Sequence, residues 1–218
     1  MSAPESLVLL PEIAQIRFSD EDLLNLTRLV YGRLTGLFYR KRYALVSALL
    51  DGSYDSMIEI GFGPGIFVPT LAKRCRRLYG LDMHRDMSKV ATVLGAHTSN
   101  FIPMTADLAH IPVKACSFDA VICMSVLEHV EDLRGAIEEM SRVLKESGVL
   151  VLGFPIKNRL TRTLFAMAGY DDSVIHPSSH EDILSAAREG FTLVGARSYP
   201  AWMGSWGLYY AACYAKQR

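Results

Sequence analysis

The run Glu59–Gly65, with the sequence EIGFGPG, constrains the fold of this chain more than any other segment. It follows a short apolar stretch, Met57–Ile60, that predicts a strand, and it opens a stretch with helical character, Ile66–Arg74. Glycines at such a strand-to-helix turn let the backbone turn tightly and approach a ligand closely. In open α/β sheets such ligands lie beyond the carboxyl ends of the strands. The run therefore predicts a ligand-binding turn, with a plain tight turn as the alternative interpretation.

After residue 50 the chain alternates between apolar runs typical of strands and amphipathic runs typical of helices. Such alternation indicates a parallel sheet with helices on both faces. The further strands predicted in this way are Leu78–Leu81, Phe101–Met104, Ala120–Met124 and Val149–Phe154. The further helices are Arg85–Leu94, Leu133–Leu144 and Ser179–Arg188, with a turn at Ser147-Gly148 and a capping box formed by Ser178 and Glu181.

Two β-rich runs, Leu193–Tyr199 and Leu208–Tyr214, end the chain with only a loop between them. A loop of about eight residues is too short for a parallel crossover, which needs a dozen or more. We therefore expect these two strands to be antiparallel neighbours. The fold class that follows is α/β, a doubly wound sheet that is mostly parallel with one antiparallel strand near the edge and helices on both faces.

Residues 1–50 precede this alternation and are predicted to form an N-terminal helical cap. Ser19 is the expected N-cap of a first helix, because acidic residues follow it in the first turn. Apolar residues recur with a helical period from Leu23 to Phe38, and a second helical stretch runs from about Arg42 to Leu50. We expect residues 51–218 to form the main domain, with a lid insert at 156–177.

Composition excludes several classes of protein. Half of the residues are hydrophobic, and 23 basic residues balance 23 acidic ones. This balance argues against a nucleic-acid-binding protein, which usually carries a basic excess to neutralise phosphates. The four cysteines show no metal-ligand spacing, so we expect no metal site, reduced thiols and a cytoplasmic location. No apolar run is long enough for a transmembrane helix, and the short apolar stretch Leu7–Leu10 lacks the basic segment that precedes a signal sequence.

The spacing of the glycines limits the classes of ligand that this turn can bind. The pattern is G-x-G-x-G, which differs from the G-x-G-x-x-G of dinucleotide-binding folds and lacks the Gly-Lys-Ser/Thr of a P-loop. Pro64 removes one N–H group that a phosphate cradle would use. Asp82, at the end of the next strand, is placed to accept hydrogen bonds from ribose hydroxyls, and Asp107, at the end of the third, from an exocyclic amine. The alternatives are a turn residue for Asp82 and a turn residue or helix N-cap for Asp107.

Several segments between residues 55 and 155, in order, resemble one known family. They are IEIGFGPG, YGLDMH, TADLAHIP, SFDAVICMSVLEHV and SRVLKESGVLVLGFP. The chain resembles the class I S-adenosylmethionine-dependent methyltransferases, and within them the methyltransferase type 11 group. The segment HPSSHEDILSAAREGFTLVGA is similar to the last helix and following strand of that family. The resemblance implies a Rossmann-like sheet of seven strands, S-adenosylmethionine as cofactor and S-adenosylhomocysteine as product.

The resemblance also implies roles for particular residues. Glu59 would hold the amino group of the cofactor's methionine moiety, and Asp82 would bind the ribose. Asp107 would accept a hydrogen bond from the adenine amine. The other residues implied to line the cofactor are Gly61, Phe62, Gly63, Gly65, Met83, Ala106, Leu108, Met124 and Ser125. Phe62 departs from the family pattern, in which a small or polar residue is common.

Histidines supply the candidates for acid–base chemistry. His129 follows the fourth strand, and its ordinary pKa near neutrality suits a general base. The alternative is a structural residue at the start of a helix. His176 and His180 have the i,i+4 spacing of a metal pair, but Pro177 disfavours a single helix through both. A capping segment is the preferred interpretation there, and His176 facing the acceptor pocket is a further alternative.

The leading functional prediction is an enzyme that methylates a small-molecule or lipid-like acceptor, which can be apolar. A nucleic-acid or protein methyltransferase is the first alternative, although residues 123–126 lack the Asn/Asp-Pro-Pro-aromatic run used on base amines. A non-enzymatic protein that keeps the fold and the cofactor site is the second. The segment 28–43 mixes basic and aromatic residues, which can bind nucleic acid or a lipid surface. A helix with one solvated face is the preferred interpretation of them, and the oligomeric state is left open.

Overall fold

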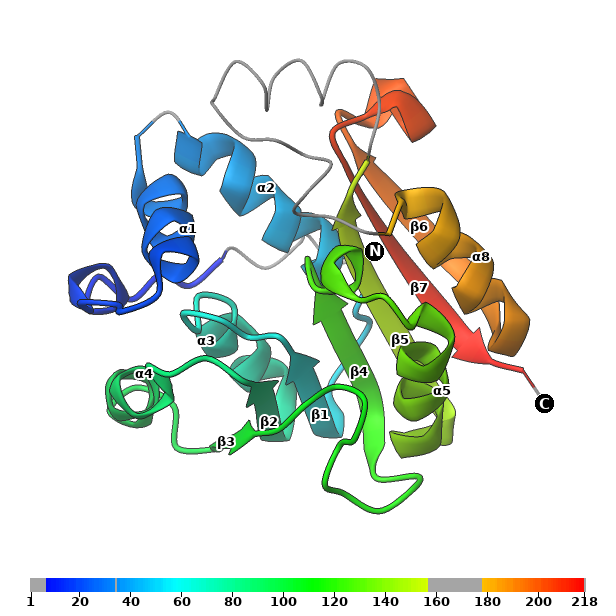
Figure 1. The fold of residues 1–218 in the computed structure, drawn as a ribbon, viewed down its shortest axis with the longest axis horizontal. Coiled ribbons are helices and arrows are strands. Elements are labelled where there is room, and N and C mark those ends of the chain that lie inside the picture. Colours follow the sequence, from blue (N-terminus) through cyan, green and yellow to red (C-terminus); the bar gives the residue numbers. More distant parts are fainter. Residues whose placement is uncertain (1–6, 34, 157–177, 218) are drawn as a thin grey trace.

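The computed structural model describes residues 7–33, 35–156 and 178–217. Its centre is a seven-stranded sheet with the strand order β3-β2-β1-β4-β5-β7-β6 (Figure 1). Every neighbouring pair from β3 to β5 is parallel, whereas β7 runs antiparallel to both β5 and β6. The predicted doubly wound, mostly parallel sheet with one antiparallel strand near the edge is therefore confirmed.

The bounds of the elements follow the predicted alternation closely. The strands are β1 (Tyr54–Ile60), β2 (Cys75–Asp82), β3 (Phe101–Thr105), β4 (Phe118–Met124), β5 (Leu144–Pro155), β6 (Phe191–Tyr199) and β7 (Tyr209–Lys216). The helices are α1 (Glu21–Tyr31), α2 (Thr35–Ser47), α3 (Val68–Leu71), α4 (Met87–Gly95), α5 (Leu133–Val143) and α8 (His180–Gly190). Short 3-10 helices span Ile13–Gln15, Ala72–Arg74, Leu127–His129 and Ala201–Trp206.

Two predicted boundaries between elements were wrong. The helix expected over Ile66–Arg74 is only α3 followed by a 3-10 turn, because β2 already begins at Cys75. The segment Ser147-Gly148 is not a turn between helix and strand. It lies inside β5, where the pairing with β4 shifts register between Phe118 and Ala120. An irregularity of this kind lets one strand carry extra residues without leaving the sheet.

Two helix caps lie one residue away from the predicted positions. Asp20, not Ser19, caps α1, since its carboxylate accepts hydrogen bonds from the backbone of Asp22 and Leu23. Ser19 instead donates from its backbone and its hydroxyl to Asp86, which holds the N-terminal segment against α4.

The capping box of α8 is likewise formed by Ser179 with Asp182 rather than by Ser178 with Glu181. Ser178 is turned inward, and its hydroxyl donates to the Val130 carbonyl oxygen at 2.7 Å. The one-residue shift therefore frees Ser178 to hold the start of α8 against the segment that follows β4.

Each face of the sheet has its own hydrophobic core because side chains alternate along every strand. In β4, Ala120 and Ile122 pack into the core shared with α2, α3 and α4. Val121 and Cys123 point the other way, into the core shared with α5 and α8. A strand buried on both faces reads as a continuous apolar run, which is why β4 was recognised from sequence.

Helices α1 and α2 lie on the side of the molecule toward which the parallel strands point (Figure 1). A Cβ atom added to Gly63 would lie 3.4 Å from the side chain of Leu23 of α1. The guanidinium of Arg42 of α2 donates a hydrogen bond to the hydroxyl of Ser125 after β4. The N-terminal segment thus covers the carboxyl ends of the strands. Within the three described ranges, no helix is long and apolar enough to cross a membrane.

The packing of α5 generates a test of this fold. Met140 is fully buried against the sheet, whereas Glu138, on the same helix, is exposed. We expect Met140→Ala to lower the free energy of unfolding by about 3 kcal/mol, the usual cost of deleting a large buried side chain. Glu138→Ala should change it by less than about 0.5 kcal/mol. Urea denaturation of the two variants measures both values, and equal costs would contradict the described orientation of α5.

Candidate active site

The strand order places a topological switch point between β1 and β4. From β1 the chain continues to β2 and β3 on one side, and β4 and β5 lie on the other. Ligands of open α/β sheets bind in the crevice outside the carboxyl ends of the strands at such a point. Glu59, Asp82, Met124 and Ser125 all lie at the carboxyl ends of β1, β2 and β4, so the sheet brings these predicted cofactor residues to one edge.

The glycine-rich turn after β1 requires its glycines. Gly61, Gly63 and Gly65 have φ values of 70°, 52° and 77°, which are disfavoured for other residues. A Cβ on Gly61 would lie 2.1 Å from the Cγ2 atom of Val126, and one on Gly65 would lie 2.7 Å from Leu94. The turn is therefore packed tightly between the segment after β4 on one side and α4 on the other.

Asp82 ties this turn to the end of β2. One oxygen of its carboxylate accepts from the backbone N–H of Gly63 at 2.7 Å, and the other accepts from the N–H groups of Met83 and His84 at 2.7 and 3.1 Å. A carboxylate has about four lone-pair sites, and three are used here, so one site is left for a ribose hydroxyl. Met83 is 62% exposed at this strand end, as a side chain that packs on an adenine ring would be. Both the turn role of Asp82 and the ribose role are compatible with this geometry.

Glu59 is the second-last residue of β1, and its carboxylate is buried. The residue is 3% exposed, and its Oε2 atom has no hydrogen-bond partner among the described residues. Burial, together with the nearby charge of Asp82, raises the pKa of Glu59 well above its ordinary value. A buried acid with an unpaired oxygen is costly unless a ligand compensates it. The ammonium group of the methionine moiety of S-adenosylmethionine is a group that fits this carboxylate.

The residues predicted at the end of the third strand follow β3 directly. Leu108 is buried, Ala106 is half-buried and Asp107 is exposed. The Asp107 carboxylate accepts from the backbone N–H of Ala109 at 2.9 Å, which is the hydrogen bond of a turn. The Ala106 N–H donates to the Asp82 carbonyl oxygen at 3.3 Å, so this segment lies beside the predicted ribose site.

The fourth strand ends in an unusual conformation. Ser125 has a φ of 57°, and its N–H donates to the Gly153 carbonyl oxygen of β5 at 2.7 Å. Its hydroxyl lies 3.1 Å from the hydroxyl of Tyr209 and accepts from the guanidinium of Arg42. A non-glycine residue in the left-handed region indicates a backbone held in place by its surroundings, as is frequent at functional sites. Met124, just before it, is 9% exposed.

Sequence reasoning missed Arg42 and Tyr209. Arg42 belongs to the segment interpreted as a helix with one apolar and one solvated face, and no role was predicted for it. Its guanidinium carbon lies 4.6 Å from the ring centre of Tyr209 and 5.2 Å from that of Tyr39. The i,i+3 spacing of Tyr39 and Arg42 is compatible with such stacking, but the partner on β7 could not be found without the sheet order.

The positions of the predicted histidines give little support for a catalytic role. His129 is exposed at the end of the 3-10 helix after β4, four residues beyond Ser125. His180 is the first residue of α8, and His176 and most of the predicted lid insert lie outside the described residues. In the part of the chain that the structure describes, no group of three or more His, Cys, Asp or Glu side chains could hold a metal.

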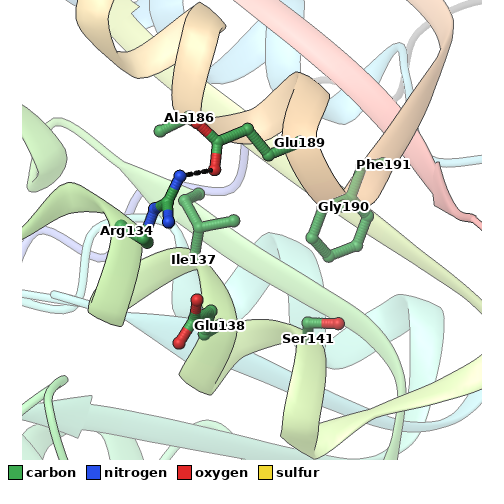
Figure 2. Close-up of a pocket in the computed structure, with 8 residues that line it drawn as sticks. All are labelled: Arg134, Ile137, Glu138, Ser141, Ala186, Glu189, Gly190 and Phe191. Carbon is green, nitrogen blue, oxygen red and sulfur yellow. Dashed lines mark hydrogen bonds and ion pairs between the residues drawn. The ribbon is translucent and has the colours of Figure 1, made fainter.

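Two surface cavities lie elsewhere. One, of about 290 Å³, separates α5 from α8 and contains the 2.5 Å ion pair of Arg134 with Glu189 (Figure 2). Another, of about 600 Å³, is lined by residues of the N-terminal segment and α1, including Arg17 and Tyr31. Neither cavity contains a residue predicted to bind the cofactor, so the candidate site rests on the strand ends and the glycine-rich turn.

The sequence of this chain is similar to those of known methyltransferases. Residues 58–152 match the family described as "Methyltransferase domain". A ubiquinone biosynthesis O-methyltransferase of Xanthomonas oryzae pv. oryzae is 33% identical over 131 residues, which cover 58% of this chain and 52% of that protein. The chain thus spans about half the length of the curated relatives that it matches.

Solved structures extend the likeness of the fold beyond the matched domain. The N-methyltransferase NodS from Bradyrhizobium japonicum, in complex with S-adenosylhomocysteine, has a TM-score of 0.67 at 21% identity over 91% of this chain and 100% of that chain. The [4+2]-cyclase SpnF has a TM-score of 0.64 at 18% identity over 81% of this chain and 80% of that one. Residues 58–152 thus match the methyltransferase family that the sequence motifs indicated.

Proposed function

We propose that this protein is an S-adenosylmethionine-dependent methyltransferase that acts on an oxygen atom of a small-molecule or lipid-like acceptor. The observation that carries the proposal is the pairing of two acids around the glycine-rich turn, Glu59 at the end of β1 and Asp82 at the end of β2. The match of residues 58–152 to the methyltransferase family supports the reaction class. The O-methyltransferase relatives support oxygen as the acceptor atom.

In this mechanism the protein mainly binds and orients. Asp82 accepts a hydrogen bond from the ribose, and Glu59 faces the ammonium group at the other end of the cofactor. Met124 and Ser125 lie where the methionine end reaches β4. The bound cofactor supplies a methyl group already activated on a sulfonium. Alignment of an acceptor oxygen with that methyl group is worth several kcal/mol of the barrier, and His129 is our candidate for a base that removes the acceptor's proton.

Further features of the proposal concern the whole chain. The described part of residues 7–50 acts as a cap over the strand ends, whereas the predicted lid insert at 156–177 lies, apart from Ile156, outside the described residues. All four cysteines are free thiols, and burial raises the pKa of Cys75 and Cys213 to about 12 and about 11. Thiols of this kind suit a reducing compartment, so we propose a cytoplasmic location.

The alternatives differ in what they predict for turnover. The [4+2]-cyclase with a similar fold illustrates that the fold alone does not fix the reaction. Incubation with methyl-labelled S-adenosylmethionine and a panel of catechols and phenols measures transfer directly. Transfer of label to a hydroxyl supports the proposal. Tight cofactor binding without transfer to any acceptor, including RNA and protein, would instead support a non-enzymatic binding protein.

Asp82 provides the most direct test of the cofactor site. We expect Asp82→Ala to weaken S-adenosylhomocysteine binding by at least about tenfold, because hydrogen bonds to a charged group contribute about 1.5–3 kcal/mol each. Isothermal titration calorimetry measures the affinity. The matched control is Asp55→Ala, since Asp55 lies exposed on the same sheet and pairs with Arg76 and Arg77. Unchanged affinity in Asp82→Ala, with a folded protein, would contradict the ribose assignment.

The raised pKa of Glu59 leads us to expect that the free energy of unfolding depends on pH in a particular way. Because its pKa is raised in the folded state, the unfolded chain releases this proton at lower pH than the folded chain does. The contribution of Glu59 to the free energy of unfolding therefore falls as pH rises above its ordinary pKa of 4.5. We expect Glu59→Gln to lose less stability than the wild type between about pH 5 and about pH 8. Urea denaturation at several pH values measures this difference.

The control for this experiment is Glu131→Gln, an exposed residue whose replacement should leave the pH profile of the wild type unchanged. Parallel profiles for wild type and Glu59→Gln would show that Glu59 titrates normally. In the same variant we expect weaker S-adenosylhomocysteine binding, since a neutral amide replaces the carboxylate that faces the ligand's ammonium group.

A further inference from the structure

The larger surface cavity, of about 600 Å³, lies between the N-terminal segment and α1. Residues 14–18 form one of its walls, and α1 with the following Gly32 forms the other. Cavities that bind small molecules usually measure about 300–1,000 Å³, so this one is large enough for a ligand. The predicted cofactor residues do not line it, so the proposed methyl transfer leaves the cavity without a role.

Contacts with α4 hold the N-terminal wall of this cavity in place. Ser19, just after the wall, donates from its backbone N–H and its hydroxyl to the Asp86 carboxylate at 2.6 and 2.9 Å. The ammonium group of Lys89 donates to the Arg17 carbonyl oxygen at 2.7 Å. Phe18, between these two points, is buried in the core below α4. The cavity is therefore formed before any ligand arrives, which lowers the ordering cost of binding.

Much of the lining is apolar. The Thr27 hydroxyl in the wall already donates to the Leu23 carbonyl oxygen at 2.7 Å. The Tyr31 hydroxyl likewise donates to the Leu10 carbonyl oxygen at 2.6 Å, and burial raises the pKa of Tyr31 to about 12, so it carries no charge at neutral pH. Because both hydroxyls have partners, the lining suits an apolar group. The apolar residues that line the cavity are Ala14, Ile16, Phe18 and Leu24.

Two arginines, Arg17 and Arg28, line the same cavity from opposite walls. Both are exposed, and no ion pair within 4.0 Å among the described residues includes either of them. Of the acids in residues 7–20, Glu12 lies 3.7 Å from His97 and Asp20 caps α1. The two guanidinium groups are thus available to a ligand, and their planar forks of N–H donors match carboxylate and phosphate oxygens.

We propose that this cavity binds an anionic amphiphile, a molecule with a carboxylate or phosphate group on an alkyl chain. Arg17 and Arg28 bind the oxyanion from the two walls, and the apolar lining removes the chain from water. The charge of the ligand complements the two unpaired arginines, which a neutral apolar ligand would leave unused. The site shares no residue with the predicted cofactor site, so the inference goes beyond the proposed methyl transfer and does not depend on it.

The test is calorimetric titration of the full chain at neutral pH with four probes, each below its micelle concentration. They are octyl phosphate, octanoate, 1-octanol and inorganic phosphate. At least one of the two anionic amphiphiles should bind at least about tenfold more tightly than 1-octanol, the effect expected of hydrogen bonds to a charged group. Octyl phosphate should also bind at least about tenfold more tightly than inorganic phosphate, because its chain leaves water. The tighter of the two amphiphiles identifies the preferred oxyanion.

Variants of the two arginines assign the preference to this cavity. Arg17→Gln and Arg28→Gln should each weaken the tighter anionic amphiphile by at least about fivefold and change 1-octanol affinity by less than about twofold. Both side chains are exposed, so both variants should fold. The matched control is Arg33→Gln, an exposed arginine just beyond α1 that does not line the cavity, and this variant should bind every probe as the wild type does.

Four outcomes overturn the inference. No binding of any probe, or equal affinity for the amphiphiles and 1-octanol, excludes an oxyanion site. Equal affinity for octyl phosphate and inorganic phosphate excludes a role for the chain. A preference that survives in both arginine variants, or that falls equally in Arg33→Gln, excludes this cavity as the site. Competition between the amphiphile and S-adenosylhomocysteine assigns the amphiphile to the cofactor site. Because the probes are tested without methyl transfer, a protein that transfers no methyl group contradicts the proposed function alone.

Discussion

The reversal of strand order between β1 and β4 determines where this molecule can hold a ligand. Because the chain winds outward from β1 through β2 and β3, and from β4 through β5, the loops after β1 and β4 diverge. The glycine-rich turn fits against this point only because Gly61 has no Cβ to collide with Val126. The positions of Glu59, Asp82 and Ser125 all follow from this one topological feature.

Two ionisable side chains of opposite type, the buried Glu59 and the half-buried Arg42, lie on either side of this point. Glu59 lies under the turn after β1, and Arg42 lies against Ser125 after β4. Burial disfavours the charged form of both, and neither is part of a described ion pair. Isolated buried charges are uncommon unless function retains them.

The sequence predicted the part of the molecule that local patterns determine. The apolar run at β4 and the alternation of strands and helices led to the correct sheet, and the short final loop led to the antiparallel position of β7. Caps were missed by one residue at Asp20 and Ser179, because neighbouring polar residues cap equally well in isolation. Arg42 was missed because its environment comes from Tyr209, which is remote in sequence and reaches it only through the pairing of β5 with β7.

The central claim is that the acids at the ends of β1 and β2 hold the methyl donor across the glycine-rich turn. A crystal structure of the protein with S-adenosylhomocysteine tests it most directly. We predict a ribose hydroxyl within hydrogen-bond distance of the Asp82 carboxylate and the amino group beside Glu59. A ligand bound in the cavity between α5 and α8, or a ribose remote from Asp82, would contradict the claim.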